Sequence, residues 1–343
     1  MQAYLFVHFK EKEDPNGEAV YFSISKDGFH WQKINGGSPI LTSTIGEQGV
    51  RDFTICRTKE GIYYIISTDL SLARNFKTKY KGSWENVSRE GSRNLVLWES
   101  PDLIHWSAPR LISFGNEPFG CVWAPDIIFD SEAGDYLIHW SSSHLSNNYG
   151  NKKIYYSRTK DFKTFTSPEI LYEKEDSDII DSALYKDGEN FYLFVKSNPS
   201  PAAILLLQSQ YITGPFSIIP KFSEEMKKLE QGQYEAPTAF RTEDGRWCLF
   251  LDYYGTKIKE KQGYVPFIAK TISSGNFIRS DQSFSFPYGF KHGTVLTINQ
   301  EEYHRLESAH FIQEKFGIII QPKTLTIIDA TTNKGGSIDV SKR

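Results

Sequence analysis

Five polar side chains recur along this sequence at nearly regular intervals, each at the start of a predicted β-strand. Successive members are 74, 55, 54 and 57 residues apart. Carboxylates and imidazoles are the side chains that most often transfer protons in enzymes. Carboxylates that converge on one pocket also repel one another and raise one another's pKa, which favours a functional site over a structural role. The five residues are Asp52, Asp126, Asp181, Glu235 and His292.

The segments that follow these residues share one pattern. Each has a strand, a turn with acidic residues, an aromatic-rich strand, a loop and then two further strands. One unit begins "RDFTICRTKEGIYYIISTDL" (51–70) and another "EAPTAFRTEDGRWCLFLDYY" (235–254). A repeat of this length with four strands is typical of a β-propeller blade. A two-sheet sandwich with regular strands does not explain the interval.

We therefore predict an all-β, five-bladed β-propeller with four-stranded antiparallel blades in a single domain, 1–343. A fifth blade built from both ends of the chain closes the ring. Four blades span approximately 51–113, 124–172, 180–220 and 235–284, and the fifth combines 291–298 with 3–41.

Helical pattern is confined to two short segments, 223–232 and 299–310, for which Ser223 and Asn299 are the expected N-caps.

The strand starts of such a propeller lie at one mouth of its central channel. An antiparallel meander returns the end of each second strand to that same face. The long loops after the second strands, rich in polar and aromatic residues, therefore surround the five side chains. These loops are 71–93, 143–153, 197–203 and 252–266.

Charge and cysteine content exclude several classes of partner. The net charge is −3 with both signs interspersed, so neither nucleic acid nor a membrane surface is an expected partner. The three cysteines are widely spaced and form no CxxC pair or disulfide framework. The chain opens "MQAYLFVHFKEKED", without the pattern of a signal peptide, and we expect a cytoplasmic protein.

The motifs around four of the five residues resemble those of glycoside hydrolase family 43. They are "VRDFTI" with Asp52, "VWAPDI" with Asp126, "YEAPTAF" with Glu235 and "KHGTV" with His292. The resemblance covers nearly the whole chain. The family consists of five-bladed propellers that cleave arabinofuranosides, xylosides and related pentose or galactose linkages. One departure is Phe53, which follows Asp52 where the family usually has proline.

The resemblance implies a role for each motif residue. Asp52 would be the general base, Glu235 the general acid, and Asp126 the group that raises the pKa of the acid and orients it. His292 would lie beneath the sugar and contact a central water or a calcium ion, and no cofactor is required. An inverting glycosidase needs such a pair, one carboxyl protonating the leaving oxygen and one activating water on the opposite face of the ring.

Substrate contacts are expected from aromatic and polar side chains at the mouth, since sugars pack their apolar faces on flat rings. The candidates are Phe53, Trp123, Asp181, His292, Tyr149 and Tyr254.

The predicted function is an exo-acting α-L-arabinofuranosidase that acts on arabino-oligosaccharides. A β-xylosidase or β-galactosidase of the same family and a non-catalytic sugar-binding propeller remain alternatives, the last because of Phe53. "Asp14-Pro15-Asn16-Gly17" is similar to the nucleophile motif of retaining, invertase-like propellers, but it follows a charged run and is a strong turn signal. A protein-interaction propeller would need no carboxylates in its channel.

Overall fold

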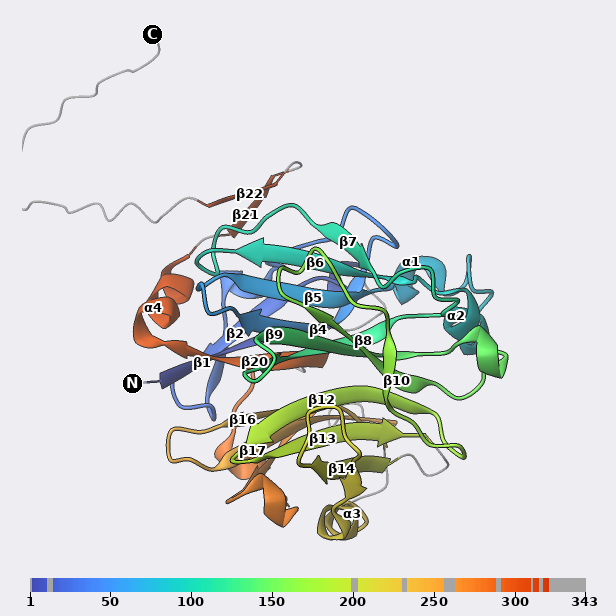
Figure 1. Ribbon diagram of the computed structural model, residues 1–343. Coiled ribbons are helices and arrows are strands. Elements are labelled where there is room, and N and C mark those ends of the chain that lie inside the picture. The colour runs from blue at the N-terminus through green and yellow to red at the C-terminus, as the bar shows by residue number, and fades with distance from the viewer. Residues whose placement is uncertain are drawn as a thin grey trace, which may run out of the picture.

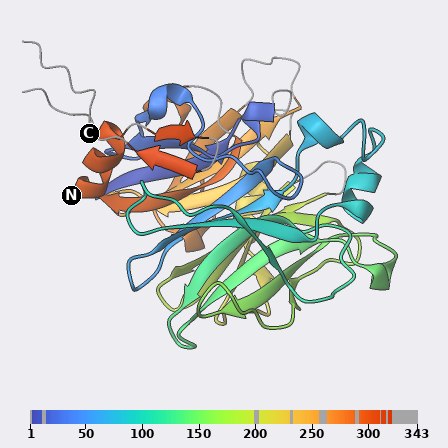
Figure 2. The same cartoon turned by 90° about the horizontal axis from the view of Figure 1, so that it is seen from above.

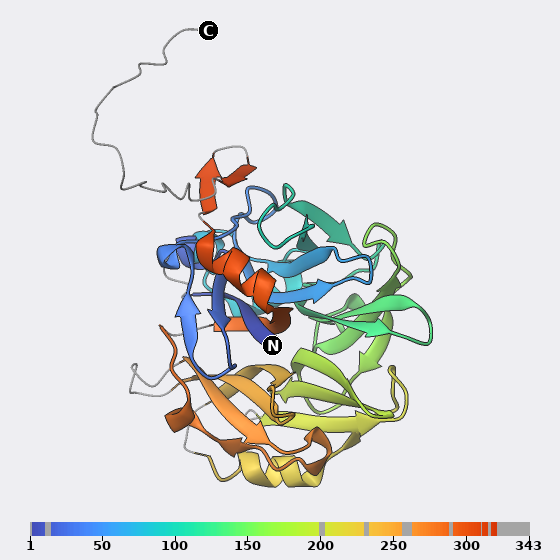
Figure 3. The same cartoon turned by 90° about the vertical axis from the view of Figure 1, so that its left-hand side faces the viewer.

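Five antiparallel sheets of four strands each surround a central axis in the computed structural model (Figures 1 and 3). This confirms the predicted five-bladed propeller. The structure describes residues 2–10, 15–198, 203–229, 233–255, 263–287, 291–309, 311–314 and 317–320. Parts of two predicted mouth loops, 199–202 and 256–262, and Asp14 of the turn motif lie outside these residues.

Four blades are continuous in sequence. The first contains β4 (Val50–Arg57), β5 (Tyr63–Asp69), β6 (Asn94–Ser100) and β7 (Arg110–Ser113). The second contains β8 (Trp123–Asp130), β9 (Asp135–Ser142), β10 (Lys153–Thr159) and β11 (Glu169–Tyr172). The third contains β12 (Ile179–Asp187), β13 (Asn190–Ser197), β14 (Ala203–Ser209) and β15 (Ser217–Ile218). The fourth contains β16 (Gln233–Arg241), β17 (Trp247–Tyr254), β18 (Gly263–Ala269) and β19 (Ile278–Arg279).

The fifth blade joins the two ends of the chain, as predicted. It contains β20 (Lys291–Asn299), β1 (Gln2–Phe9), β2 (Tyr21–Ser25) and β3 (Trp31–Lys33). The strands β20 and β1 pair antiparallel from Gln2 opposite Asn299 to Phe9 opposite Lys291. The first strands β4, β8, β12, β16 and β20 contact one another in turn around the axis, so they line the channel.

Short helices lie outside the sheets. Two of them, α1 (Leu72–Asn75) and α2 (Trp84–Glu90), form within the predicted mouth loop 71–93 and lie on the face opposite α4 (Gln300–Ser308) (Figures 1 and 2). The remaining helix is α3 (Pro220–Met226). Single 3₁₀ turns are η1 (Pro15–Gly17), η2 (Asn35–Gly37), η3 (Leu145–Asn147), η5 (Ile272–Ser274) and η6 (Asp281–Ser283), and a separate hairpin pairs β21 (Phe311–Glu314) with β22 (Gly317–Ile320).

The two predicted helices have different outcomes. Asn299 caps α4, and its side chain accepts from the Glu302 N–H while the Glu302 carboxylate accepts from the Asn299 N–H. The Ser223 cap was wrong, since α3 begins three residues earlier with Pro220 in its first turn. Proline fits there because its missing N–H would have no partner within the helix.

A β-bulge interrupts the first strand of every blade near the channel mouth. The pairing register shifts between Arg51 and Thr54 in the first blade, and correspondingly in the others. In four blades the first bulge residue has a left-handed backbone, with φ of 54° at Asp52, 48° at Ala124, 51° at Asp181 and 54° at Ala236. Bulges of this kind re-aim side chains that would otherwise alternate between two faces.

The bulge also corrects the predicted equivalence of the five polar residues. Asp52 and Asp181 occupy the left-handed position, Glu235 lies one residue before it, and Asp126 two residues after it. These four acidic residues therefore lie at different distances from the channel mouth. No helix in the described part of the chain combines the length and apolarity needed to cross a membrane.

Candidate active site

A cavity of about 580 Å³ opens at the mouth of the channel. Its walls come from the starts of first strands, the ends of second strands and the loop 71–93, as the propeller geometry predicts. Its lining residues are Phe9, Arg51, Asp52, Leu72, Trp84, Trp123, Lys152, Asp178, Ile180, Lys196, Asn198, Glu235, Asp252, Tyr254, Lys291 and His292. Of the predicted site residues, the structure brings Asp52, Trp123, Glu235, Tyr254 and His292 into this cavity.

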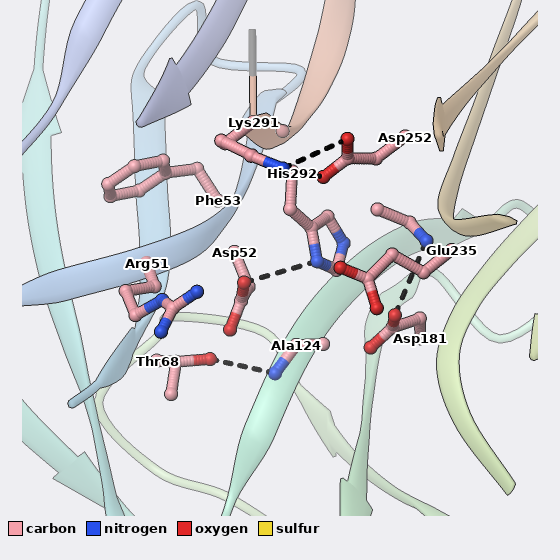
Figure 4. A network of polar contacts seen from close by, with 12 residues as sticks. Arg51, Asp52, Phe53, Thr68, Ala124, Asp181, Glu235, Asp252, Lys291 and His292 are labelled. Carbon is pink, nitrogen blue, oxygen red and sulfur yellow. Dashed lines mark hydrogen bonds and ion pairs between the residues drawn. The ribbon is translucent and has the colours of Figure 1, made fainter. Parts of the chain in front are cut away.

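Asp52 and His292 form an ion pair across the junction of the first and fifth blades (Figure 4). His292 Nδ1 lies 3.1 Å from Asp52 Oδ1. Burial opposes the charge of the imidazole, but Asp52, Asp181 and Glu235 outweigh it and raise the pKa of His292 to about 9. Burial likewise opposes ionisation of Asp52, yet His292 and, less strongly, Arg51 lower its pKa. Asp52 is therefore held as a carboxylate near neutral pH.

Glu235 is paired with a buried lysine from the third blade. Lys196 Nζ donates to Glu235 Oε2 at 2.8 Å and to the Tyr254 hydroxyl at 2.6 Å. The lysine side chain is only 3% exposed. Desolvation opposes its charge, but Glu235 and Asp181 together keep the pKa of Lys196 above its usual value. A buried charge of this kind is stable only with such partners.

Asp181, rather than Asp126, lies beside the Glu235 strand (Figure 4). Asp181 Oδ2 accepts from the N–H of Ala236, the residue after Glu235, at 3.3 Å. Burial raises the pKa of Asp181 to about 6, with repulsion from Glu235 adding to the effect and His292 opposing it.

Asp126 sits deeper, outside the cavity lining. Its carboxylate accepts from Thr54 Oγ1 at 2.8 Å and from the Leu184 N–H at 3.3 Å, and burial raises its pKa to about 6. These contacts do not place it against Glu235, so the expected effect of Asp126 on the acid is not supported. The geometry assigns that neighbour position to Asp181.

Three of the predicted sugar contacts do not line the cavity, and Asp181 beside the Glu235 strand is one of them. Phe53 is 1% exposed and packs with Phe9 in the hydrophobic core between the first and fifth blades, so its predicted sugar contact is wrong. Tyr149 lies on the loop after β9, 5.5 Å from the Arg89 guanidinium. It is absent from the cavity walls.

The missing proline after Asp52 leaves the local backbone unchanged. Pro125 and Pro237 follow the left-handed residue in the second and fourth blades, whereas Phe53 and Ser182 do so in the first and third. The φ angle of Asp52, 54°, equals that of Ala236, which does precede proline. The bulge, and not proline, therefore sets the direction of Asp52.

Four cations and two carboxylates in the cavity were not predicted. They are Arg51, Lys152, Lys196, Lys291, Asp178 and Asp252. Asp252 receives Lys291 Nζ at 3.1 and 3.2 Å, and burial together with the charge of Glu235 raises its pKa to about 7 against the pull of Lys291. A signal was present in the sequence, because Lys196 and Asp252 interrupt the apolar second strands "NFYLFVKS" and "WCLFLDYY" near their mouth ends.

The expected metal position finds no support in the side chains. Among the described residues there is no group of three or more His, Cys, Asp or Glu side chains placed to hold a metal ion. His292 uses its Nδ1 atom for Asp52. We therefore derive no step that involves calcium.

Comparisons with known proteins agree with this architecture. A family model described as "probable glycosyl hydrolase domain", related to glycoside hydrolase family 43, matches residues 1–304. An α-L-arabinofuranosidase from Bifidobacterium longum subsp. longum is 27% identical over 247 residues. That match covers 66% of this chain but only 22% of the Bifidobacterium protein, so the chain spans about a fifth of its relative.

Two solved structures share the fold. A xylan β-1,4-xylosidase from Bacillus halodurans superposes with a TM-score of 0.56 and 20% identity, covering 78% of this chain and 50% of that one. An endo-1,4-β-xylanase from Bacteroides thetaiotaomicron gives a TM-score of 0.55 and 11% identity, covering 85% of this chain and 93% of that one. At these identities the likeness concerns the fold alone.

Proposed function

Because the chain belongs to the family of glycosyl hydrolase domains related to glycoside hydrolase family 43, we propose that it is an inverting, exo-acting α-L-arabinofuranosidase. Its substrates would be arabino-oligosaccharides, or other oligosaccharides that end in a pentose. The observation that carries the proposal is the pair Asp52 and Glu235, which come from different blades and face one cavity, each beside a cationic side chain. The name of the Bifidobacterium relative supports the choice of sugar.

Asp52 suits the role of general base. The base must be ionised to take a proton from the attacking water. His292, Arg51 and a hydrogen bond from Thr68 stabilise this ionised state. The proposal therefore gives His292 a positioning role, since it acts on the reaction through Asp52.

Glu235 suits the role of general acid only if the cavity retains a proton. Burial raises the pKa of Asp181 to about 6 and that of Asp252 to about 7. The cavity carboxyls as a group therefore bind a proton as the pH falls towards neutrality. We place this proton on Glu235 in the productive complex, where the leaving oxygen displaces the Lys196 ammonium.

Asp181 is the neighbour that favours this protonated acid. Its negative charge repels that of Glu235, and repulsion between carboxylates favours the neutral form of one of them. Its hydrogen bond from the Ala236 N–H also anchors the backbone next to the acid. In the proposed mechanism Asp181 thus replaces Asp126 as the group that tunes and orients Glu235.

Substitution of either catalytic carboxyl should abolish turnover. We expect Asp52→Asn and Glu235→Gln each to lower kcat on arabinobiose, whose sugar leaving group must be protonated, by about 10³-fold, because general acids and bases contribute on that scale. Glu132→Gln, on the exposed turn after β8, is the matched control. Wild-type protein that binds a panel of arabinosides, xylosides and galactosides but hydrolyses none would refute the enzyme and leave the sugar-binding alternative.

The stereochemistry of the first product tests the assignment of Asp52 as a base. We expect proton NMR during early turnover to show the anomer opposite to that of the substrate, since water attacks the face away from the leaving group. Mutarotation then equilibrates the two anomers, so spectra must be taken within minutes. Retention of configuration would instead make a carboxylate the nucleophile, as in the invertase-like alternative.

Variants of the two neighbouring aspartates separate their roles. Asp181→Asn removes a negative charge next to Glu235, so we expect kcat to fall by about tenfold or more and the alkaline limb of the pH–rate profile to move to lower pH. Asp126→Asn should lower thermal stability through its contacts with Thr54 and Leu184 while leaving that limb in place. A shift produced by Asp126→Asn alone would restore the role predicted from the sequence.

The pH–rate profile should report the charge of His292. The wild-type rate should fall below the lowered pKa of Asp52, where the base becomes protonated. It should fall again as pH rises through about 6 to about 7, where the cavity carboxyls as a group lose the proton that the acid needs. His292→Gln removes a cation from all these carboxyls and should move both limbs up by about one pH unit.

The control for this shift is His30→Gln, at an exposed turn on the other face. A His292→Gln profile with lower amplitude but unchanged limbs would mean that the histidine only supports the fold.

A further inference from the structure

A second cavity lies next to the catalytic one, on the loop 71–93. It encloses about 450 Å³. Leu72 and Trp84 belong to the walls of both cavities, so the two are continuous neighbours. Its lining residues are Leu72, Ala73, Arg74, Phe76, Lys77, Thr78 and Trp84. These residues include no carboxyl, thiol or imidazole, so the second cavity, which we call the insertion cavity, is suited to binding rather than to acid–base catalysis.

Trp84 is the dominant side chain of the insertion cavity. It is 51% exposed although it is the largest apolar residue type in the chain. Its ring lies 5.5 Å from that of Phe76 and 6.4 Å from that of Trp123, the latter at 82°. The edge-on contact with Trp123 leaves indole surface open. Flat exposed rings of this kind bury the C–H face of a sugar ring favourably.

Polar groups at the rim complement such a ligand. Arg74, Lys77 and Thr78 are exposed and supply N–H and O–H donors beside the apolar wall. A pyranose or furanose ring has the same division, with C–H groups on its faces and hydroxyls around its edge. The Thr78 hydroxyl donates to the Arg74 carbonyl and Arg74 Nε to the Gln48 carbonyl, so the rim is also held in place by its own hydrogen bonds.

The loop is held firmly enough to present a preformed site. Two buried glutamates that the proposed reaction does not use anchor it from outside. Glu18 accepts from the Ser71 hydroxyl and the Leu72 N–H at 2.6 and 2.8 Å. Glu47 accepts from Tyr80 and, at 2.9 Å, from Lys79. Anchoring before binding reduces the entropy lost when a ligand orders the site.

We propose that the insertion cavity is a sugar-binding subsite for the part of the substrate beyond the cleaved bond. The terminal pentose occupies the catalytic cavity, and a sugar ring of the remaining chain packs against Trp84. This inference rests on the proposed function and extends it. The substrate class is then an oligosaccharide or a decorated polysaccharide chain, and a glycoside with a one-carbon aglycone uses only half of the site.

Binding to an inactive protein tests the subsite apart from catalysis. In the Asp52→Asn background, titration calorimetry would compare arabinose, which fills one subsite, with arabinopentaose. We expect Trp84→Ala to weaken pentaose binding at least about tenfold more than arabinose binding, a difference of about 1.4 kcal/mol, because only the pentaose reaches the Trp84 ring. Trp84→Phe should restore part of the loss. Tyr211→Ala, an exposed aromatic in the turn after β14, is the control for non-specific sugar binding.

Kinetics in the active protein provide the second readout. Trp84→Ala should raise KM for arabinopentaose far more than KM for methyl α-L-arabinofuranoside. The ratio of the first KM to the second should rise by about tenfold. Thr78→Trp, which fills the insertion cavity from its rim, should act in the same direction and guards against a folding defect of Trp84→Ala.

The outcomes separate the two proposals. Equal losses for arabinose and pentaose would make Trp84 part of the catalytic cavity alone and overturn the subsite. If the alkyl tail of an alkyl glycoside bound in the insertion cavity and the pentaose did not, the subsite would also be overturned. The cavity would then hold an apolar aglycone. Pentaose binding that depends on Trp84 in a wild-type protein without hydrolytic activity would retain the subsite and refute the proposed enzyme.

Discussion

The pairing of β20 with β1 is the constraint on which the site depends. It joins the two ends of the described fold over the span from Gln2 to Phe9 and completes the ring of five blades. The same pairing carries His292 to the channel mouth, where it meets Asp52 from the first blade. The most basic imidazole and the most strongly stabilised carboxylate of the site thus come from strands at opposite ends of the sequence. The strand pairing that closes the ring therefore also places the cation that keeps the base ionised.

The bulges explain how five strands that should alternate can present so many charges to one cavity. Strict alternation would send Arg51 and Asp52 to opposite sides of the strand. With the bulge, both line the cavity, as do Lys291 and His292 in the fifth blade. The first and fifth blades therefore each contribute two neighbouring residues to the mouth. This supplies cations close enough to balance the carboxylates, without which the burial of Asp181 and Asp252 would be too costly.

The fold was accessible from the sequence because every blade repeats the same local pattern, and local patterns need no knowledge of distant contacts. The Asn299 cap was accessible for the same reason. The shared cavity of Asp52 and Glu235 followed from topology. The neighbour of Glu235 was missed because Asp126 lies two residues after the left-handed position of its bulge, whereas Asp181 occupies that position. The Ala-Pro pairs of the second and fourth blades mark this offset, since Ala124 and Ala236 both hold the left-handed position. Phe53 was misplaced for a similar reason, since the bulge turns its ring into the core.

Catalysis and selectivity draw on different parts of this fold. The charged groups of the reaction come from strand ends, whose backbone is held by the sheets and by the hydrogen bonds of the bulges. The insertion cavity comes from one loop of one blade, and its anchors, Glu18 and Glu47, line neither cavity, although Glu18 Oε1 lies 3.8 Å from the Arg51 guanidinium. Changes in that loop can therefore alter which oligosaccharide binds without disturbing the catalytic carboxylates. A propeller with a fixed charged channel and one elaborated loop can therefore keep its chemistry while its choice of substrate varies.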